Sequence, residues 1–196
     1  GLSLLLVDAA TPGITRRPHR TVDGQRAAEI GFDQVQVGSD ALLGELNQGH
    51  DLARTVVDET LLALGAEAVG ALSVLVYGTV EYARTRKQFG VAIGNFQALQ
   101  HRMADMFMAY EQSRSLLLAA TLKVHEGHAD AALAVHALKA QLGSGGRRVA
   151  QEAIQLHGGM GMTAELAIGH YFKRLTAIDA LFGNADRHVL AYARAS

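Results

Sequence analysis

Hydrophobic residues change their spacing near residue 47 of this 196-residue chain. Before that point, "LSLLLVD" is a continuous apolar run, "ATPG" is typical of a turn, and "AAEIGFDQVQV" alternates apolar and polar positions. These patterns predict strands between residues 1 and 45, with a buried first strand. Both prolines, Pro12 and Pro18, fall in this part. We therefore expect a β segment followed by a segment of another class.

After residue 47, apolar residues recur at helical spacing. The stretch from Leu52 to Val80 predicts one long helix that ends near Arg86. At about 1.5 Å per residue this helix exceeds about 50 Å, so it must pack in a bundle. Three further helices and a short last one are predicted at 96–127, 130–157 with Asp130 as N-cap, 164–180, and after Gly183.

A "GSGG" run at residues 143–146 interrupts the helix predicted over 130–157. Each glycine inside a helix costs about 1 kcal/mol relative to alanine. The run indicates close helix packing or a local kink. A loop that cradles phosphate is an alternative, but no strand precedes the run and no Gly-Lys-Ser/Thr sequence follows it.

Composition narrows the class of protein. Hydrophobic residues make up 49% of the chain, which excludes a disordered segment. No apolar run approaches the roughly 20 residues that span a bilayer, so we expect a soluble cytoplasmic protein without membrane contact. The net charge of -1 gives no general attraction to nucleic acid. Because the chain starts with Gly1 in a strand-like run, we also expect it to be a C-terminal fragment of a longer protein.

Redox or metal chemistry would need groups from outside the chain. With no cysteine there is no disulfide, no thiolate metal site and no cysteine nucleophile, so redox chemistry requires a bound cofactor. The cluster "HEGH" at residues 125–128 has no third ligand nearby in sequence. We interpret it as a solvated helix end and predict no metal site.

Two stretches carry candidate chemistry. In "RTRKQFGVAIGNFQALQHRMADM", residues 84–106, arginine stands beside glutamine amides, which suits a phosphate or a polar ring edge. A solvated basic helix end is the alternative interpretation. In "QEAIQLHGGMGMTAE", residues 151–165, paired glycines end a helix and also allow a flat ligand to approach, and Thr163 can cap the next helix. Taken alone, this second stretch is typical of a plain helix-turn-helix.

Together and in this order, the two stretches resemble the acyl-CoA dehydrogenase family. The family shows "R-x-x-F-G-x-x-I-x-x-F-Q-x-x-Q-x-x-L-A-D-M" and, about 60 residues later, "Q-x-x-G-G-x-G-x-x-x-E". The resemblance implies a mainly α fold. Residues 1–46 would be the end of the middle β-domain and residues 47–196 the C-terminal four-helix bundle, with the N-terminal helical domain absent.

The resemblance also implies an activity. Members of the family use FAD to oxidise an acyl-CoA thioester to the trans-2-enoyl-CoA. A glutamate removes the α-proton while a hydride leaves the β-carbon for the flavin, and an electron-transfer flavoprotein reoxidises the FAD. The enzymes are usually tetramers, in which each FAD lies between one subunit's own domains and the C-terminal helices of its neighbour.

The positions that contact the neighbour's FAD match the family. Arg86 matches the arginine that reaches the pyrophosphate, which is reasonable for a bidentate charge partner. Gln88, Phe89 and Gln97 match positions on the adenosine side, and "QLHGG", residues 155–159, matches the segment that packs against the same half of the cofactor. The implied cofactor-binding residues are Arg86, Gln88, Phe89, Gln97, Gln155, Leu156, Gly158 and Gly159.

The substrate side departs from the family. The common catalytic glutamate lies in a tail motif "Y-E-G-T-S-x-x-Q", and Leu181 and Phe182 stand here at the tyrosine and the glutamate. Other branches place the base on the first long helix, where this chain has Thr60, followed by Leu61 in place of a frequent arginine. Neither phenylalanine nor threonine can take the α-proton, so no residue of this chain is assigned as the catalytic base.

Other residues near these positions are candidates for the base. Glu59 is adjacent to Thr60, but one residue along a helix turns the side chain by about 100°. Asp179 and Asp186 are out of register, and Asp186 is typical of a helix-start charge. A histidine, His157 or His188, has a suitable pKa range. A histidine in a tail helix is usually exposed, so we expect His188 at the surface.

The tail "LFGNADRH" resembles "F-G-D-A-D-x-H", found in the base-lacking subunit of bacterial α2β2 heterotetramers. Such pairs act on bulky thioesters such as sterol side chains, or on dicarboxyl-CoA. We therefore predict a subunit that completes the FAD site of a catalytic partner. The alternatives are a homotetrameric dehydrogenase with a displaced base, Glu59, and a structural member of the fold without flavin.

Overall fold

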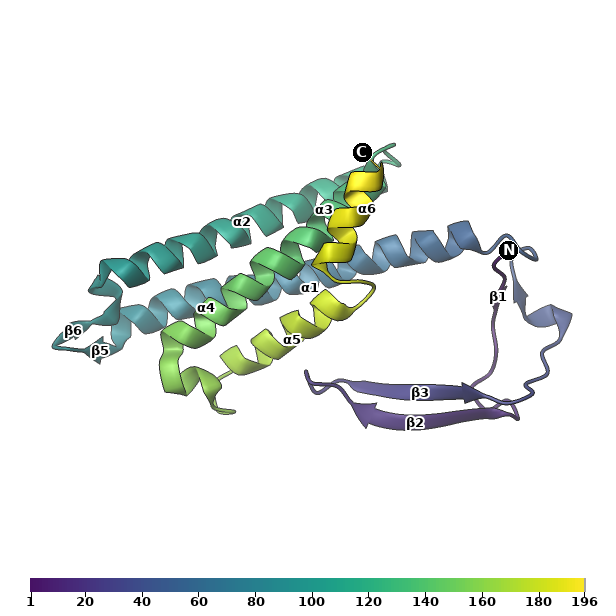
Figure 1. Cartoon of the computed structure of the whole chain (residues 1–196), viewed down its shortest axis with the longest axis horizontal. Helices are drawn as coiled ribbons and strands as arrows, with labels where there is room; N and C mark the ends of the chain where they lie inside the picture. Colours follow the sequence, from purple (N-terminus) through teal and green to yellow (C-terminus); the bar gives the residue numbers. More distant parts are fainter. Residues whose placement is uncertain (196) are drawn as a thin grey trace. The chain divides into compact units, whose positions relative to one another are not determined.

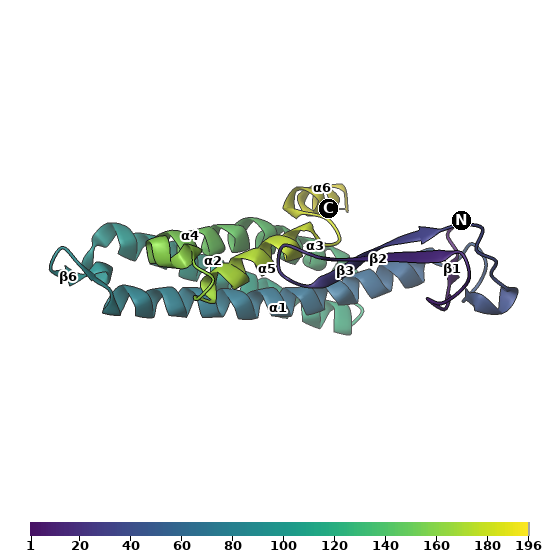
Figure 2. The same cartoon turned by 90° about the horizontal axis from the view of Figure 1, so that it is seen from below.

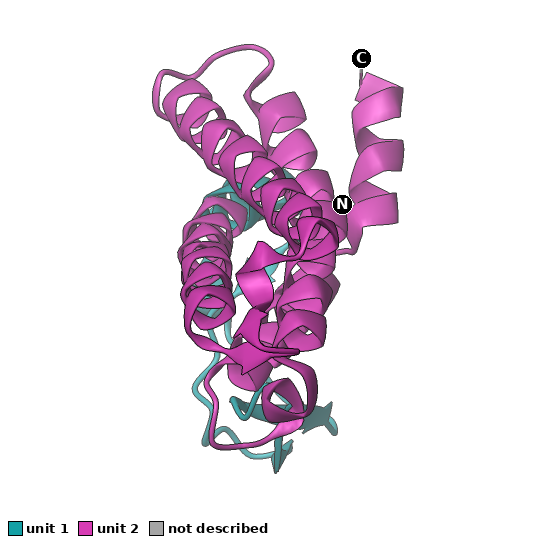
Figure 3. Cartoon of the chain, turned by 90° about the vertical axis from the view of Figure 1, so that its left-hand side faces the viewer, with its two compact units in different colours: residues 1–59 teal, residues 60–196 magenta. Residues whose placement is uncertain are grey.

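The computed structural model describes residues 1–195. These residues form two compact units, which divide between Glu59 and Thr60 (Figure 3). The division falls inside one helix, α1, which runs from His50 to Thr85. Each unit is described by itself.

The first unit is built on an antiparallel hairpin of β2, Ile14–Arg20, and β3, Arg26–Phe32 (Figure 1). The register pairs Ile14 with Phe32 and Arg20 with Arg26. Pro18 is tolerated inside β2 because β3 is the only strand that pairs with β2 among the described residues. The hairpin confirms the β class predicted for this part.

Two details of the first unit differ from the expectation. The run "LSLLLVD" contributes only a two-residue strand, β1, Leu4–Leu5, which pairs with β4, Leu42–Leu43. Leu5 and Leu6 are 53% and 77% exposed, so the prediction of a buried strand is wrong for these residues. The segment after Phe32 contains no strand until β4, although its alternating pattern suggested one.

The second unit is the helical bundle that the spacing predicted. After the part of α1 from residue 60 onward, a two-strand hairpin leads into α2, and the remaining helices follow with short turns between them. Figures 1 and 2 show α2 and the α3–α4 pair running alongside α1. The elements are β5, Lys87–Gln88; β6, Val91–Ala92; α2, Gln97–His125; α3, Ala131–Gln141; α4, Arg147–His157; α5, Ile168–Ala180; and α6, Ala185–Ala195.

The core of the bundle lies along α1. Leu61, Leu72 and Leu75 are at most 2% exposed. Gly65 lets α3 approach closely, because a Cβ there would lie 2.9 Å from a methyl carbon of Leu138. Full burial stabilises the fold by about 1.5–3 kcal/mol for each leucine relative to an exposed side chain.

Helix α1 bears on the expectation that the protein makes no membrane contact. By length and composition it is apolar enough to cross a membrane, with 44% of its most apolar 18-residue window buried inside the protein. The sequence analysis looked for an unbroken apolar run of about 20 residues and found none, whereas a window of high mean hydropathy, which tolerates a few polar residues, does occur in α1. The core helix of a soluble protein passes the same test, so this is weak evidence for a membrane.

The "GSGG" run forms a π-helical turn, Leu142–Gly146, between α3 and α4. A Cβ on Gly143 would collide with the carboxylate of Asp179 and lie 2.7 Å from the Cβ of Ala185. The run therefore gives both a local change in helix geometry and a close approach of the chain's tail. This confirms the interpretation as close packing, with a π-helical turn in the helix.

The start of α5 differs from the prediction by four residues. A 3-10 turn, Gly158–Met162, follows α4, and α5 begins at Ile168 rather than at Ala164. The hydroxyl of Thr163 donates to the carbonyl oxygen of Met160 at 2.9 Å, so it does not cap α5. Asp130 does precede α3, but its carboxylate binds Lys123 and His128 instead of the helix amides.

Candidate cofactor-binding site

The hairpin between α1 and α2 carries the first candidate residues. Its two-residue loop is Phe89 and Gly90, with φ values of +54° and +83°. Two positive φ values are what a tight I′ hairpin loop requires, and they are unfavourable for a phenylalanine. The Phe89 side chain is 92% exposed and meets the ring of Phe96 edge to face, with centroids 6.2 Å apart. An exposed aromatic ring in this backbone conformation is suited to contact with a ligand or another chain.

Six of the eight predicted residues line one cavity of about 470 Å³. The cavity lies between the end of α1, the β5–β6 hairpin and the end of α4, so helices distant in sequence meet there. Phe89 and Gln97 do not line the cavity, and Gln97 is an exposed residue at the start of α2. The six residues are Arg86, Gln88, Gln155, Leu156, Gly158 and Gly159.

Tyr82 and His157 form a rigid part of the cavity wall. Their rings stack with centroids 4.3 Å apart, and the Tyr82 hydroxyl donates to the His157 carbonyl oxygen at 3.4 Å. The His157 Nδ1 atom donates to the carbonyl oxygen of Ala153 at 2.8 Å, because a carbonyl can only accept. Both ring orientations are therefore fixed. Tyr82 was not predicted from the sequence, although it stands four residues before Arg86, whose backbone amide donates to the Tyr82 carbonyl oxygen at 2.8 Å.

The paired glycines leave the cavity open at the end of α4. Gly158 has a φ of +61° and ends the helix, as predicted. No atom lies within 4 Å of a Cβ built on Gly158 or Gly159. In contrast, a Cβ on Gly161 would lie 2.7 Å from the Ile154 carbonyl oxygen, so that glycine is required for packing. The first two glycines thus leave space in which another molecule can approach the backbone.

The residues present fit a dinucleotide cofactor chemically. Within residues 1–195, Arg86 makes no ion pair with a carboxylate, and it is one of the residues that line the cavity. A guanidinium in this position suits a pyrophosphate, and the amides of Gln88 and Gln155 can donate to or accept from a polar ring. The donor set therefore agrees with the half of the FAD site that the resemblance implies.

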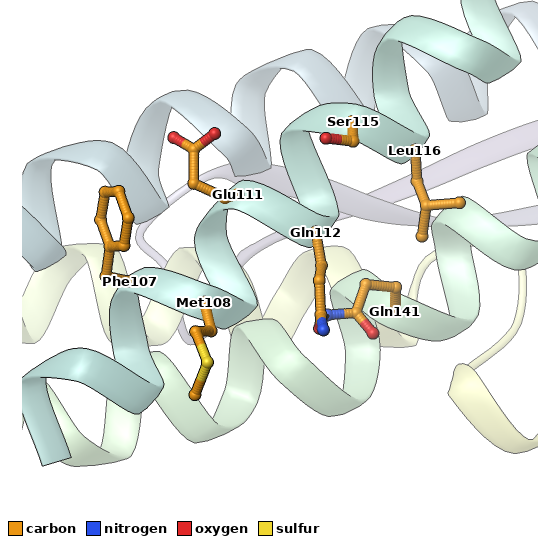
Figure 4. A pocket seen from close by; sticks show the side chains of 7 residues that line it. All are labelled: Phe107, Met108, Glu111, Gln112, Ser115, Leu116 and Gln141. Carbon is orange, nitrogen blue, oxygen red and sulfur yellow. The ribbon is translucent and has the colours of Figure 1, made fainter. Parts of the chain in front are cut away.

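A larger hollow of about 690 Å³ lies elsewhere, on α2 and the end of α3 (Figure 4). Its walls carry one carboxylate, Glu111, and the amides of Gln112 and Gln141, which bond to each other at 3.3 Å. No cation lines it, and Phe107 and Met108 make much of it apolar. The smaller cavity suits a dinucleotide better by its chemistry, because it brings an arginine, amides and open glycine backbone together.

The tail places Phe182 in a turn between α5 and α6. Leu181 and Phe182 are 40% and 48% exposed, and Phe182 has a φ of +57°. On α1, Glu59 is exposed and Thr60 is half-buried, as expected for neighbours about 100° apart on a helix.

The carboxylates and the histidine near the turn differ in accessibility. Asp186 is exposed in the first turn of α6, as expected. Asp179 is 6% exposed and forms an ion pair with Arg147, so this carboxylate is committed to structure. His188 is only 4% exposed, which makes the expectation of a surface histidine wrong. Its ring Nε2 atom donates to the Phe182 carbonyl oxygen at 3.2 Å.

In the histidine cluster at the end of α2, His128 is bound by a carboxylate. His128 lies 2.6 Å from a carboxylate oxygen of Asp130 through its Nδ1 atom, and its side chain is 58% exposed. Among residues 1–195, no group of three or more histidine, cysteine, aspartate or glutamate side chains is arranged to hold a metal ion.

Comparisons with known proteins agree with this fold. The family model described as "Acyl-CoA dehydrogenase, C-terminal domain" matches residues 47–196. The "Probable acyl-CoA dehydrogenase YngJ" of Bacillus subtilis is 32% identical over 98% of this chain and 51% of that protein.

Two solved structures are similar over 98% of this chain and 51% of theirs. "PigA with FAD and proline" has a TM-score of 0.92 at 28% identity, and the "ChsE4-ChsE5 complex" from Mycobacterium tuberculosis has 0.90 at 27%. The chain thus spans about half the length of these proteins. Through the match over its helical bundle, the chain belongs to the acyl-CoA dehydrogenase family.

Proposed function

We propose that this chain takes part in the FAD-dependent α,β-dehydrogenation of an acyl-CoA thioester to the trans-2-enoyl-CoA, as a subunit that completes the FAD site of a catalytic partner. One asymmetry carries the proposal. Arg86, Gln88 and the "QLHGG" segment surround one cavity, whereas Phe182 occupies the position of the usual base.

The proposed roles follow from the chemistry of the side chains. Arg86 neutralises the cofactor pyrophosphate, and Gln88 and Gln155 bind polar atoms beside it. Gly158 and Gly159 admit the cofactor against the backbone, and Phe89 and Gln97 contact the adenosine side from the hairpin and the start of α2. When bound, FAD supplies the acceptor for the substrate hydride.

The assembly belongs to the same proposal. The catalytic glutamate comes from a second acyl-CoA dehydrogenase subunit in an α2β2 heterotetramer, and similarity to the ChsE4-ChsE5 complex supports an assembly of two unlike chains. An electron-transfer flavoprotein reoxidises the cofactor, and the complex is cytoplasmic. Residues 1–46 are the end of a middle β-domain and residues 47–196 the helical domain. The substrate is a fatty or steroid acyl thioester.

The experiment replaces Arg86 in the full-length chain co-expressed with its partner. Arg86→Ala removes the charge that faces the pyrophosphate, so we expect FAD bound per complex to fall at least tenfold while the complex still assembles. Arg148→Ala is the matched control, because Arg148 is an exposed arginine on α4 that pairs with Asp105. Flavin absorbance against protein concentration measures the content. Unchanged FAD content in Arg86→Ala would contradict the proposal.

A homotetrameric dehydrogenase with Glu59 as a displaced base is the second candidate. The observation in its favour is that Glu59 is an exposed carboxylate next to Thr60, the position of the base in other branches. The third candidate, a structural protein without flavin, does not account for an unpaired arginine, amides and open glycines around one cavity.

A further inference from the structure

The tail turn, residues 181–184, is tied to the bundle by a buried lysine. Lys139 of α3 is 2% exposed, and its Nζ atom donates to the carbonyl oxygens of Asp179 at 2.8 Å and Gly183 at 2.7 Å. The Asp179 carbonyl lies in the last turn of α5, just before the tail turn, and the Gly183 carbonyl lies within the tail turn, shortly before α6. Burial lowers the pKa of Lys139, and the nearby Asp179 carboxylate raises that pKa in part. One ammonium group thus holds both ends of the turn.

The carboxylate of Asp179 fixes the start of α6. Its Oδ1 atom accepts a hydrogen bond from the backbone amide of Ala185 at 3.0 Å, and its Oδ2 atom pairs with Arg147 of α4. Gly143 leaves the space that this carboxylate occupies. Asp179 therefore satisfies an amide at the first residue of α6, which has no partner within that helix.

His188 holds the middle of the turn from the other side. Its Nε2 atom donates to the carbonyl oxygen of Phe182 at 3.2 Å, and its Nδ1 atom lies 3.0 Å from Nδ1 of His136 on α3. Figure 1 shows α6 following directly on α5 and lying beside α3, the helix that carries Lys139 and His136. Side chains from α3 and α6 thus bind the backbone of the tail turn, and a side chain from α5 binds the first amide after it.

This set of bonds explains how Phe182 keeps a positive φ of +57°. The left-handed conformation is unfavourable for a residue with a Cβ, and such a residue persists only where its surroundings determine the backbone. The carbonyl of Phe182 itself and the carbonyls of Asp179 and Gly183 are all bound by buried side chains.

We propose that Lys139, Asp179 and His188 form a clamp, the tail clamp, that positions residue 182 at the substrate. The three are positioning residues, since they act on the backbone around residue 182. The inference rests on the proposed function in one respect, namely that Phe182 stands at the position of the usual base, from which it would face an acyl thioester. The clamp keeps that position defined even though its occupant is Phe182 and not a carboxylate.

The first test measures amide hydrogen exchange in the full-length chain within its assembly. Lys139→Met keeps the aliphatic stem and removes both bonds to the turn, so we expect amides of residues 181–190 to exchange at least tenfold faster. Amides of residues 151–165, at the cofactor cavity, should keep their rates. The control is Lys123→Met, because Lys123 pairs with Asp130 at the surface. Unchanged exchange in the tail would overturn the clamp.

If Lys139→Met does not fold, a milder substitution tests the same clamp. Asp179→Asn keeps an oxygen that can accept from Ala185 and removes the charge that pairs with Arg147. It should speed tail exchange less than Lys139→Met does, with Asp105→Asn as the control at an exposed ion pair. If Asp179→Asn exchanges in the tail no faster than this control, the clamp is wrong.

The second test asks what residue 182 faces. In Phe182→Glu, the new carboxylate should take the α-proton of a bound acyl-CoA, breaking the C–H bond and forming O–H, and return a deuteron from D₂O. This exchange needs no oxidant, so mass spectrometry of the thioester reports it without flavin turnover. The partner's own glutamate is replaced by glutamine to remove its contribution. We expect at least tenfold more deuterium than with Phe182→Gln.

The two tests separate failure of the clamp from failure of the proposed function. Adding Lys139→Met to Phe182→Glu should lower deuterium incorporation at least tenfold, and adding Lys123→Met should not. Equal incorporation in both double variants would overturn the clamp. If tail exchange shows the clamp but Phe182→Glu incorporates no more deuterium than Phe182→Gln, position 182 does not face an acyl thioester, and the assignment of Phe182 to the position of the usual base is wrong.

Discussion

His188 shows how the tail makes stability depend on pH. Burial lowers the pKa of its imidazole below the ordinary 6.5, and His136, Lys139 and Arg187 lower it further, while the hydrogen bond to the Phe182 carbonyl opposes the change. The folded state therefore favours neutral His188. Its contribution is complete above pH 6.5 and is lost as pH falls below 6.5 through the lower folded pKa.

Replacing His188 should therefore flatten the pH profile of stability. Each unit by which the folded pKa is lowered corresponds to about 1.4 kcal/mol at low pH. We expect the free energy of unfolding of His188→Gln to fall less between pH 7.5 and pH 5 than that of the unmodified protein. Urea unfolding at four pH values measures the slopes, and His170→Gln, at an exposed position on α5, is the control. Parallel slopes for all three proteins would exclude this role.

For individual residues, the sequence predicted which side chains have suitable chemistry but not which of them are buried. Arg86, Gln88 and the "QLHGG" segment were chosen from local motifs, and the fold brings them to one cavity. The burial of His188 and the structural bonds of Asp179 were not predicted, because their partners on α3 and α4 lie far away in sequence. Lys139, which bonds to Asp179 across 40 residues, is the example. A signal for Lys139 was present, since it continues the buried stripe of Val135, Leu138 and Leu142.

The π-helical turn between α3 and α4 is the element on which the tail's position depends. Gly143→Ala would place a methyl group against the Asp179 carboxylate and 2.7 Å from the Cβ of Ala185, and both belong to the packed tail. We expect a loss of about 1–3 kcal/mol in the free energy of unfolding, as for other overpacked sites.

At a second glycine, the same substitution to alanine should raise the free energy of unfolding instead of lowering it. Gly70 lies within α1 with no atom within 4 Å of a built Cβ, so Gly70→Ala should stabilise the protein by about 0.5–1 kcal/mol through helix propensity. Urea unfolding of both variants measures the contrast. If Gly143→Ala is as stable as Gly70→Ala, the close approach of the tail is not what requires glycine.

Helix boundaries were predicted well where the apolar spacing continues over many residues and poorly where a turn precedes the helix. Helix α1, with its 36 residues, ends one residue before the Arg86 that its spacing predicted. In contrast, α5 begins four residues late, because the 3-10 turn Gly158–Met162 uses residues whose composition also suits a helix start. In the first unit, apolar "LSLLLVD" predicted burial that these residues lack.

For the whole molecule, the bundle followed from periodicity and the family from two motifs, but the assembly depends on chains outside this one. Expression of the full-length chain alone tests that assembly. If the base comes from a partner, the protein purified alone should show no acyl-CoA dehydrogenation, and co-expression should restore it with both chains in the complex. Native mass spectrometry and flavin absorbance measure composition and cofactor content.

The substitution Glu59→Gln distinguishes the heterotetramer from the homotetramer through its effect on the kcat of the assembled enzyme. In a heterotetramer the substitution should leave kcat within about twofold, because an exposed side chain of this chain takes no part in proton transfer. In a homotetramer that uses Glu59 as base, loss of the carboxylate should lower kcat by about 10²-fold or more. Thr55→Ser, at an exposed position one turn earlier on α1, is the control. A yellow, active homotetramer that loses activity with Glu59→Gln would replace the partner model, because it would place the base in this chain after all.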